Sequence, residues 1–303
     1  MSETVSVFGD INLDVFVKAK ENMKFGGDVE GFIKLLPGGA GLNIATWVKR
    51  AEPTTNVILI GSVGDDFIAD YILNYARSEG LRLIVSRVNQ KPTGKTLIFV
   101  DKTGERSMLS FKGANSFISI DSSDEKHIYH SKIVHASAYT LLDNTQKTVS
   151  MQVINEAHSK GIITSLNLVA YNRMANKKQQ RDIFTVLKKV NMLFTNLEEG
   201  KKLTNKNEPS EIIKWVIKKY GDVAIVTLGR NGCIAGNKNE IFSANSKNVS
   251  VVDTTGAGDA FVGTFLAKYS KGLTFKECII EAINASTHAI KTFGAIPERY
   301  GPE

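Results

Sequence analysis

Residues 251–263 read Val-Val-Asp-Thr-Thr-Gly-Ala-Gly-Asp-Ala-Phe-Val-Gly and form the most informative stretch of the chain. A β-rich run leads into a glycine turn, and this turn opens an apolar helix expected over about 257–271. Small, flexible residues let successive backbone N–H groups point outward, and a helix N-terminus adds a partial positive charge. The pattern therefore predicts an anion-binding loop at Gly256, Ala257 and Gly258.

Asp259 falls in the first turn of this helix, where the helix dipole favours the carboxylate form. A carboxylate beside an anion-binding loop suits phosphoryl transfer to an alcohol, because it can take the hydroxyl proton while the backbone holds the charge on the phosphate. The alternative is an ordinary helix-terminal charge that follows an ordinary turn. The complete string from Asp253 to Asp259 favours the catalytic interpretation.

Strand and helix patterns alternate outward from this segment with short connections. Strands are expected at 4–8, 56–60, 133–136, 162–166, 190–195 and 223–228, and helices at 43–50, 66–78, 144–159, 177–189, 257–271 and 275–292. Such alternation indicates βαβ units, and hence a mainly parallel sheet with helices on both faces. The fold class expected is therefore a three-layer α/β/α domain.

Two stretches interrupt this alternation, at about 12–37 and 92–115. Each has a period-two pattern around a turn, at Gly26-Gly27 in the first and at Lys102-Thr103-Gly104 in the second. This pattern is typical of hairpins rather than of βαβ units. A small accessory sheet outside the main layer is therefore expected.

Composition excludes several other classes of protein. The 303 residues include 38 Lys plus Arg and 31 Asp plus Glu, a net charge of 38 − 31 = +7, and 42% are hydrophobic. These values suit a globular chain, and scattered basic residues without an interleaved aromatic motif argue against nucleic-acid binding. Two cysteines without metal-ligand spacing, no signal-peptide pattern and no apolar run near the ~18 residues of a membrane helix favour a cytoplasmic protein that does not associate with membranes.

Three segments together resemble the ribokinase-like (PfkB) carbohydrate kinases. Residues 253–261 resemble the second signature of that family, Pro37-Gly-Gly-Ala-Gly-Leu-Asn-Ile-Ala45 resembles the first, and Gly9-Asp-Ile-Asn-Leu-Asp14 resembles its first strand and substrate-contacting turn. The resemblance spans nearly the whole chain in the expected order. It implies a single ribokinase-like domain over 1–303 with the accessory sheet as a lid, and lids of this family often pair between two subunits, so a homodimer through the lid is expected.

The resemblance also implies an ATP-dependent, Mg²⁺-requiring kinase that phosphorylates a hydroxymethyl group of a small sugar. Asp259 would be the base and residues 256–258 the anion hole. The substrate hydroxyls would contact Asn12, Asp14, Gly38, Gly39 and Asn43. On residue chemistry alone, Asn43 could instead make a local hydrogen bond at a helix start, and Asp14 could be an exposed strand residue.

Nucleotide and metal positions follow from weaker matches. Asn196, Thr227, Gly229, Gly232 and Asn284 would lie near the nucleotide, and Glu199 would be an outer ligand of hydrated Mg²⁺. Structural roles are the alternatives. Asn196 and Glu199 could form a capping box at a helix start, with Asn196 as the N-cap residue, and residues 227–232 could form a turn after a buried strand. Asp253 and Thr255 would help to bind a monovalent cation such as K⁺.

The identity of the substrate is less well specified. Ribokinases usually carry Lys where this chain has Ala40 and a Glu near the segment that here contains Tyr139, so ribose itself is disfavoured. A sugar is favoured over a nucleoside, because residues 101–106 and 113–115 look like the sugar-kinase hairpin. Lys112 is expected to be an exposed strand lysine, with contact to an anionic substrate as the alternative.

Other functions were weighed against this one. Residues 93–96 end like a Walker A loop, but position 89 is Asn instead of Gly, and a strand follows instead of a helix. No GxGxxG motif follows a strand, which disfavours a dinucleotide-dependent dehydrogenase. A nucleoside kinase of the same family and a non-catalytic sugar- or nucleotide-binding regulator remain as alternatives.

Overall fold

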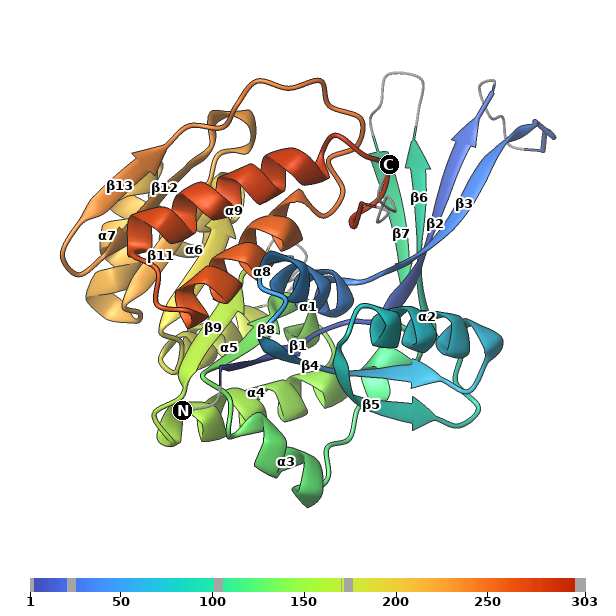
Figure 1. Cartoon of the computed structure of the whole chain (residues 1–303), viewed down its shortest axis with the longest axis horizontal. Helices are drawn as coiled ribbons and strands as arrows, with labels where there is room; N and C mark the ends of the chain where they lie inside the picture. Colours follow the sequence, from blue (N-terminus) through green and yellow to red (C-terminus); the bar gives the residue numbers. More distant parts are fainter. Residues whose placement is uncertain (1–2, 21–25, 101–105, 170, 172–176, 298–303) are drawn as a thin grey trace.

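The computed structural model describes residues 3–20, 26–100, 106–169, 171 and 177–297. In these ranges the larger sheet has nine strands in the order β13-β12-β11-β10-β9-β8-β1-β4-β5 (Figure 1). Its strands are β1 (Thr4–Phe8), β4 (Asn56–Gly64), β5 (Arg82–Val88), β8 (Ile133–Ser137), β9 (Ile163–Asn167), β10 (Met192–Asn196), β11 (Val223–Thr227), β12 (Cys233–Asn237) and β13 (Ile241–Ala244). Neighbours from β5 to β11 pair in parallel, and β12 and β13 add an antiparallel edge.

Helices cover both faces of this sheet, as the alternation predicts. One face carries α1 (Ala40–Ala51), α2 (Phe67–Ser78), α8 (Ala257–Ser270) and α9 (Phe275–Ala289). The other face carries α3 (Ser122–Ile128), α4 (Asn144–Ser159), α5 (Lys177–Leu187), α6 (Leu197–Thr204) and α7 (Pro209–Lys219). The three-layer α/β/α architecture is therefore confirmed.

Buried strands supply side chains to both layers in turn. In β4, Val57 and Leu59 join the core under α1 and α8, while Ile58 and Ile60 join the core on the opposite face. Successive side chains of a strand point to opposite faces, so a strand that is apolar at every position is buried on both sides. This is why Asn56 to Ile60 carries no polar alternation.

The accessory sheet is also confirmed. It contains β2 (Asn12–Ala19), β3 (Gly31–Gly38), β6 (Gly94–Val100) and β7 (Arg106–Phe111) in the order β3-β2-β6-β7. The two hairpins β2–β3 and β6–β7 are antiparallel, and β2 joins β6 in parallel. Figure 1 shows this sheet projecting from the main body at the upper right. The expected Lys102–Gly104 turn lies outside the described residues.

Several boundaries differ from the sequence prediction. β4 continues to Gly64 and α9 ends at Ala289, and the strands β5, β12 and β13 were not predicted. Short 3₁₀ turns follow two strands directly, at η2 (Ala138–Leu141) and η4 (Gly229–Asn231), and a third, η1 (Gly113–Phe117), follows Lys112. In the described part of the chain, no helix is long and apolar enough to cross a membrane.

Candidate active site

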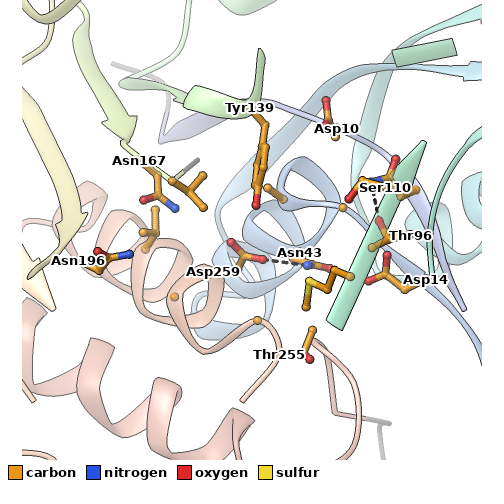
Figure 2. Close-up of a pocket in the computed structure, with 18 of the residues that line it drawn as sticks. Asp10, Asp14, Asn43, Thr96, Ser110, Tyr139, Asn167, Asn196, Thr255 and Asp259 are labelled. Carbon is orange, nitrogen blue, oxygen red and sulfur yellow. Dashed lines mark hydrogen bonds between the residues drawn. The ribbon is translucent and has the colours of Figure 1, made fainter. Parts of the chain in front are cut away.

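A cavity of about 310 Å³ lies at the carboxyl ends of the parallel strands, between the large sheet and the accessory sheet (Figure 2). Polar residues at or just beyond the ends of β1, β8, β9, β10 and β11 line it: Asp10, Tyr139, Asn167, Asn196 and Thr227. Ligands of open α/β sheets bind at this edge, where neighbouring strands connect in opposite directions. Here β1 connects onward to the β4 side of the sheet and β8 to the β9 side. We therefore take this cavity as the candidate active site.

The glycine turn before α8 opens onto this cavity. Gly256 is the N-cap residue in the left-handed region, with φ of 73°, and no side chain caps this terminus among the described residues. A Cβ at Gly258 would meet no atom within 4 Å, so the backbone there borders open space. The first turn of α8 thus presents main-chain groups to the cavity, as the sequence predicts for an anion-binding loop.

Asp259 lies inside the cavity and is held by Asn43 of α1. The Asn43 side-chain amide donates to Asp259 Oδ2 at 2.8 Å, as Figure 2 shows. The two helices can approach closely because Gly263 of α8 has no side chain. A Cβ at this position would lie only 2.6 Å from Trp47 Cβ of α1. Asn43 therefore makes a long-range bond to the candidate base rather than a local one at its helix start, and its own Oδ1 is buried with no hydrogen-bond partner among the described residues.

Burial shifts the acidity of two carboxyl groups in this cavity. Loss of solvent raises the pKa of Asp259 to about 6, although the hydrogen bond from Asn43 opposes the shift. Burial also raises the pKa of Asp14 to about 7, and the nearby charge of Asp259 adds to that rise. Buried carboxyl groups with raised pKa values are typical of catalytic sites.

The accessory sheet supplies the opposite wall of the cavity. Asp14 is 6% exposed, so the interpretation of an exposed strand residue is wrong. The Asn12 side chain donates weakly to Thr96 Oγ1 at 3.4 Å and accepts from Asn115 at 2.8 Å. Asn12, Asp14, Thr96, Ile98, Met108 and Ser110 all come from the accessory sheet and line the cavity.

The predicted residues Gly38 and Gly39 lie where the accessory sheet meets α1. A Cβ at Gly38 would overlap the Asp14 carboxyl group, so a glycine leaves room for that side chain. Gly39 has φ of 92°, which favours glycine, and it caps α1 and lines the cavity. The structure thus brings Asn12, Asp14, Gly39 and Asn43 into the cavity lining and places Gly38 directly behind Asp14.

A second cavity of about 310 Å³ continues from the first on the other side of the α8 terminus. Both cavities share Asn196, Thr227, Gly258 and Phe261. The second cavity adds the predicted Gly229 and Gly232, Ala257 at the start of α8, Ser246, and Ile283 and Ser286 from α9. Two compartments therefore meet at the glycine turn.

Asn284 does not join this set. It is exposed on α9 and belongs to the described lining of neither cavity. Helical periodicity explains the difference, because Ile283 and Ser286 are three residues apart on one face and Asn284 turns away from it. The structure thus places α9 beside the second cavity and turns the predicted Asn284 away from it.

Asn196 and Glu199 make the predicted helix cap and also lie at the cavity, and their proposed roles toward nucleotide and Mg²⁺ stay predictions. The Asn196 side chain accepts from the Glu199 backbone N–H at 2.9 Å and so caps α6. Both residues also line the first cavity, and Glu199 is 5% exposed. The cap orients the first turn of α6 and places the buried carboxyl group of Glu199 at this edge of the cavity.

Asp253 and Thr255 organise the loop before α8. Asp253 Oδ1 accepts from the Thr255 backbone at 2.9 Å and from its hydroxyl at 2.7 Å, and Oδ2 accepts from Gly294 N at 3.0 Å. These bonds tie the glycine turn to the segment that follows α9. Their proposed contact with a monovalent cation stays a prediction.

Lys112 differs from its predicted environment. Its side chain is 29% exposed, forms an ion pair with Asp10 at 2.7 Å, and donates to Tyr139 O and Gln146 Oε1. The expectation of an exposed strand lysine is therefore wrong, because β7 ends at Phe111 and turns Lys112 inward.

Several residues of the lining were not among the predicted site residues. Asp10, Thr96, Tyr139 and Asn167 are examples, and Asn115 supports the site through its bonds to Ile11 N and Asn12. A polar residue directly after a buried parallel strand is a usable signal for Asp10 and Asn167. Thr96 gave no such signal, because its contribution depends on how the accessory sheet folds over the cavity.

The site fits ATP and Mg²⁺ by its chemistry. Exposed main chain at Gly258 and an uncapped helix N-terminus suit phosphate groups. The Glu199 carboxylate is the hard oxygen donor that Mg²⁺ prefers. The described residues contain no cluster of three or more His, Cys, Asp or Glu suited to a metal ion.

Comparison with known proteins gives a consistent result. The family model described as "pfkB family carbohydrate kinase" matches residues 2–299. A ribokinase from Dictyostelium discoideum is 30% identical over 286 residues, which cover 88% of this chain and 87% of that protein.

Solved structures agree on the fold. An E. coli protein assigned as a ribokinase II and solved with ATP and Mg²⁺ matches with a TM-score of 0.87 at 19% identity, covering 97% of this chain and 94% of that one. Adenosine kinase from Sinorhizobium meliloti matches with a TM-score of 0.83 at 21% identity, covering 97% and 95%. The architecture described above is therefore the ribokinase fold.

Proposed function

This chain belongs to the pfkB family of carbohydrate kinases, and we propose that it transfers the γ-phosphoryl group of ATP to a hydroxymethyl group of a small sugar. As a family member it is a kinase, a phosphotransferase that acts on an alcohol group of a sugar or nucleoside. The proposal rests above all on the position of the α8 terminus, where the cavity that contains Asp259 meets the second cavity at Gly258.

The two cavities suit two substrates. The second cavity, with Gly229, Gly232 and Ser286, would take the nucleotide, so that its terminal phosphate points toward residues 256–258. The first cavity, with Asn12, Asp14 and Asn43, would take the sugar. Asn43 Oδ1, buried without a partner, is suited to accept a hydrogen bond from a sugar hydroxyl.

Asp259 would act as the base. Its carboxylate accepts the proton of the substrate hydroxyl as that oxygen bonds to the transferred phosphorus and the bond to the leaving ADP oxygen breaks. Backbone N–H groups of residues 256–258 stabilise the negative charge of the transferring group. Asn43 holds one oxygen of Asp259 and leaves the other for the hydroxyl. The rate enhancement would come from the positioning of the two substrates and from electrostatic stabilisation of the transferring phosphoryl group.

Glu199 and Asn196 would hold hydrated Mg²⁺ at the edge shared by the two cavities. When bound, Mg²⁺ neutralises phosphate charge during transfer. Asp253 and Thr255 would support a monovalent cation beside the glycine turn.

The accessory sheet would act as a lid over the first cavity. Thr96, Ile98, Met108 and Ser110 already form the wall of that cavity, so movement of the sheet would open or close it. A closed lid excludes water and limits wasteful hydrolysis of ATP.

A nucleoside is the second candidate substrate. The apolar side chains of Ile98, Met108 and Phe111 line the same cavity and could pack against a base. A sugar is favoured because the polar residues Asn12, Asp14, Asn43, Ser110 and Asn167 supply many hydrogen-bonding groups for hydroxyls.

Substitution of Asp259 by Asn tests the proposed chemistry. We expect kcat to fall by about 10²–10⁴-fold, because the base is lost while the shape and the Asn43 contact are kept. ATP binding, measured by calorimetry, should be unchanged. A variant that keeps a near-normal kcat would show that Asp259 is not the base.

A further inference from the structure

The wall of the first cavity contains an unusual charge arrangement. Four carboxyl groups line it, those of Asp10, Asp14, Glu199 and Asp259, and the only lysine or arginine among its described lining residues is Lys112. A cavity that binds an anionic substrate normally offers Arg or Lys donors to it. Whether Lys112 can serve a substrate therefore determines which substrates fit.

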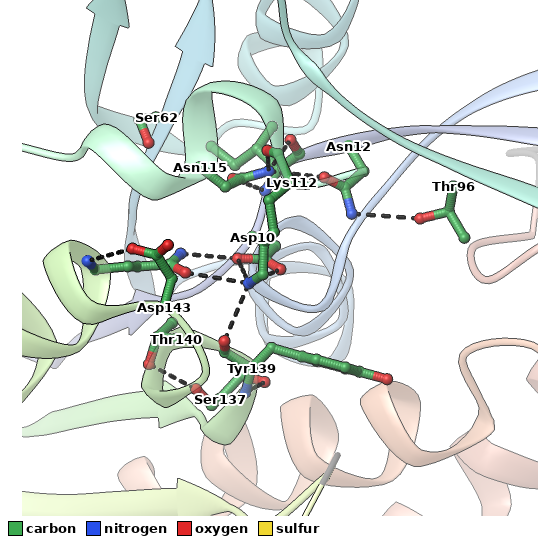
Figure 3. A network of polar contacts seen from close by, with 12 residues as sticks. Asp10, Asn12, Ser62, Thr96, Lys112, Asn115, Ser137, Tyr139, Thr140 and Asp143 are labelled. Carbon is green, nitrogen blue, oxygen red and sulfur yellow. Dashed lines mark hydrogen bonds and ion pairs between the residues drawn. The ribbon is translucent and has the colours of Figure 1, made fainter. Parts of the chain in front are cut away.

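Lys112 is fully engaged by the protein. Its ammonium group contacts Asp10 Oδ1 at 3.0 Å, Asp10 Oδ2 at 2.7 Å, Tyr139 O at 3.0 Å and Gln146 Oε1 at 3.1 Å (Figure 3). An ammonium group has three donors, so these acceptors use all of them. No donor of Lys112 is left for a phosphate or carboxylate of the substrate.

Asp10 and Gln146 hold the Lys112 ammonium group in place. Asp10 is 5% exposed and Gln146 is 1% exposed, and the Gln146 amide donates to Asp10 Oδ1 at 2.7 Å. Breaking a buried pair leaves an uncompensated charge, so the pair resists opening for a ligand. The positive charge is thus neutralised locally by Asp10.

The remaining groups of the cavity repel anions. Asp14 comes from β2 and Asp259 from α8, and both face the space between the accessory sheet and the glycine turn (Figure 2). A phosphate or carboxylate on the substrate would lie near these acids, and the described lining offers no lysine or arginine besides the engaged Lys112 to compensate its charge. The anion-binding turn at 256–258 offers no alternative, because the transferred phosphoryl group occupies that position in the proposed reaction.

We infer that the enzyme selects an uncharged polyhydroxy substrate over phosphorylated or carboxylated counterparts, and that the Asp10–Lys112 pair sets this selection. The inference rests on the proposed function, because it describes the acceptor side of the same site. The inference thus assigns an uncharged class of substrate to this chain on the basis of its own residues.

Matched pairs of compounds test the selection in the intact enzyme. Each pair keeps a free hydroxymethyl group and differs in charge: fructose and fructose 6-phosphate, ribose and ribonate, adenosine and adenosine 3′-monophosphate. We expect kcat/KM with ATP and Mg²⁺ to be at least about tenfold higher for the uncharged member of whichever pair is turned over. A higher value for the charged member would overturn the inference and leave the kinase proposal intact.

Variants test the role of the ion pair. Asp10→Asn should free the charge of Lys112 and shift the ratio of charged to uncharged turnover upward by about tenfold or more, whereas Lys112→Met should shift it downward. Asp182→Asn is the matched control, because it breaks the Lys147–Asp182 pair between α4 and α5, which belongs to the described lining of neither cavity, and should leave the ratio unchanged. The ratio of charged to uncharged turnover does not depend on how much of the enzyme is folded. If this ratio were unchanged in both Asp10→Asn and Lys112→Met, the proposed role of the ion pair in substrate selection would be wrong.

Binding separates this inference from the kinase proposal. If no compound is phosphorylated, the proposed function fails, and thermal stabilisation by the same compounds then decides the inference. Stabilisation by uncharged members alone supports it. Stabilisation by charged members, or by none of the compounds, overturns it.

Discussion

Asp259 and Asp14 are buried carboxyl groups, and their burial makes the fold less stable when they are ionised. Both carboxyl groups have a pKa raised by loss of solvent. A carboxyl group whose pKa is raised on folding favours the folded state only while it is protonated, so its contribution is lost as the pH rises through the folded value. Residues that serve catalysis in this way often oppose stability.

Asp259→Asn should therefore stabilise the protein while inactivating it. The folded and unfolded pKa values of Asp259 are about 6 and 3.8, so the variant should gain stability over the wild type between about pH 4 and pH 7, by on the order of 1–3 kcal/mol. Thermal unfolding at several pH values measures the gain. The exposed control Asp28→Asn should show no such pH-dependent gain, and equal behaviour of the two variants would contradict the buried state of Asp259.

Glu199→Gln tests the metal role against the capping role. The Asn196 cap uses the Glu199 backbone and would persist, so the fold should be kept. We expect the Mg²⁺ concentration for half-maximal rate to rise about tenfold, as is usual when a supporting ligand is lost. Glu198→Gln is the control, since that side chain is 69% exposed and pairs with Lys201. An unchanged Mg²⁺ titration for Glu199→Gln would leave this residue with its structural role alone.

Among single elements, the position of α9 relative to the glycine turn determines which of its residues line the second cavity, the proposed nucleotide site. Ile283 and Ser286 line the second cavity, and Asn284 is exposed. The sequence indicated this helix correctly, but not its rotation. Rotation depends on how Cys278, Ile279 and Ala282 pack against the sheet layer, which is a tertiary effect.

Substitutions on α9 separate the two assignments. Ser286→Tyr should fill part of the second cavity and weaken ATP binding by at least about tenfold, because a clash of this kind costs 1.4 kcal/mol or more. Asn284→Tyr, two residues away, should bind ATP like the wild type. Calorimetry with ATP provides the measurement. If Asn284→Tyr bound ATP more weakly while Ser286→Tyr bound it normally, Asn284 rather than Ser286 would belong to the nucleotide site.

Local sequence patterns predicted those strands and helices whose hydrophobic spacing is regular. The apolar alternation of strands and helices gave the three layers, and the period-two runs gave both hairpins of the accessory sheet. The long-range bond from Asn43 to Asp259 and the inward turn of Lys112 were not predicted, because they join residues 216 and 102 positions apart. Such contacts depend on the packing of α1 on α8 and of the accessory sheet on the cavity, which no local pattern encodes.

On the scale of the whole molecule, the accessory sheet has two different faces. Asn12, Asp14 and Thr96 lie on the face toward the cavity. The paired positions on the other face include many apolar residues, among them Val15, Val17, Ile33, Leu35, Leu97 and Leu109. Ile33, Leu35 and Leu109 on that face are more than half exposed. An exposed apolar face across four strands is typical of an interaction surface.

We propose that a second copy of this chain covers that face. The wild type should then have twice the chain mass of 33.2 kDa by light scattering. Leu35→Lys combined with Leu109→Lys should give the monomer mass, because two charges would be buried unpaired in the contact. Ile280→Lys, an exposed position on α9, is the control and should remain dimeric. A monomeric wild type would contradict this assembly.

The central claim is transfer of a phosphoryl group to a sugar hydroxymethyl group, and product identification by phosphorus and carbon NMR tests it most directly. Wild-type enzyme, ATP, Mg²⁺ and K⁺ would be incubated with a panel of sugars, sugar acids, sugar phosphates and nucleosides. We predict a phosphate ester on the hydroxymethyl carbon of an uncharged sugar, with ADP formed in equal amount and neither product formed by Asp259→Asn. Release of inorganic phosphate without a phosphorylated acceptor, or the same ester from Asp259→Asn at a similar rate, would contradict the account.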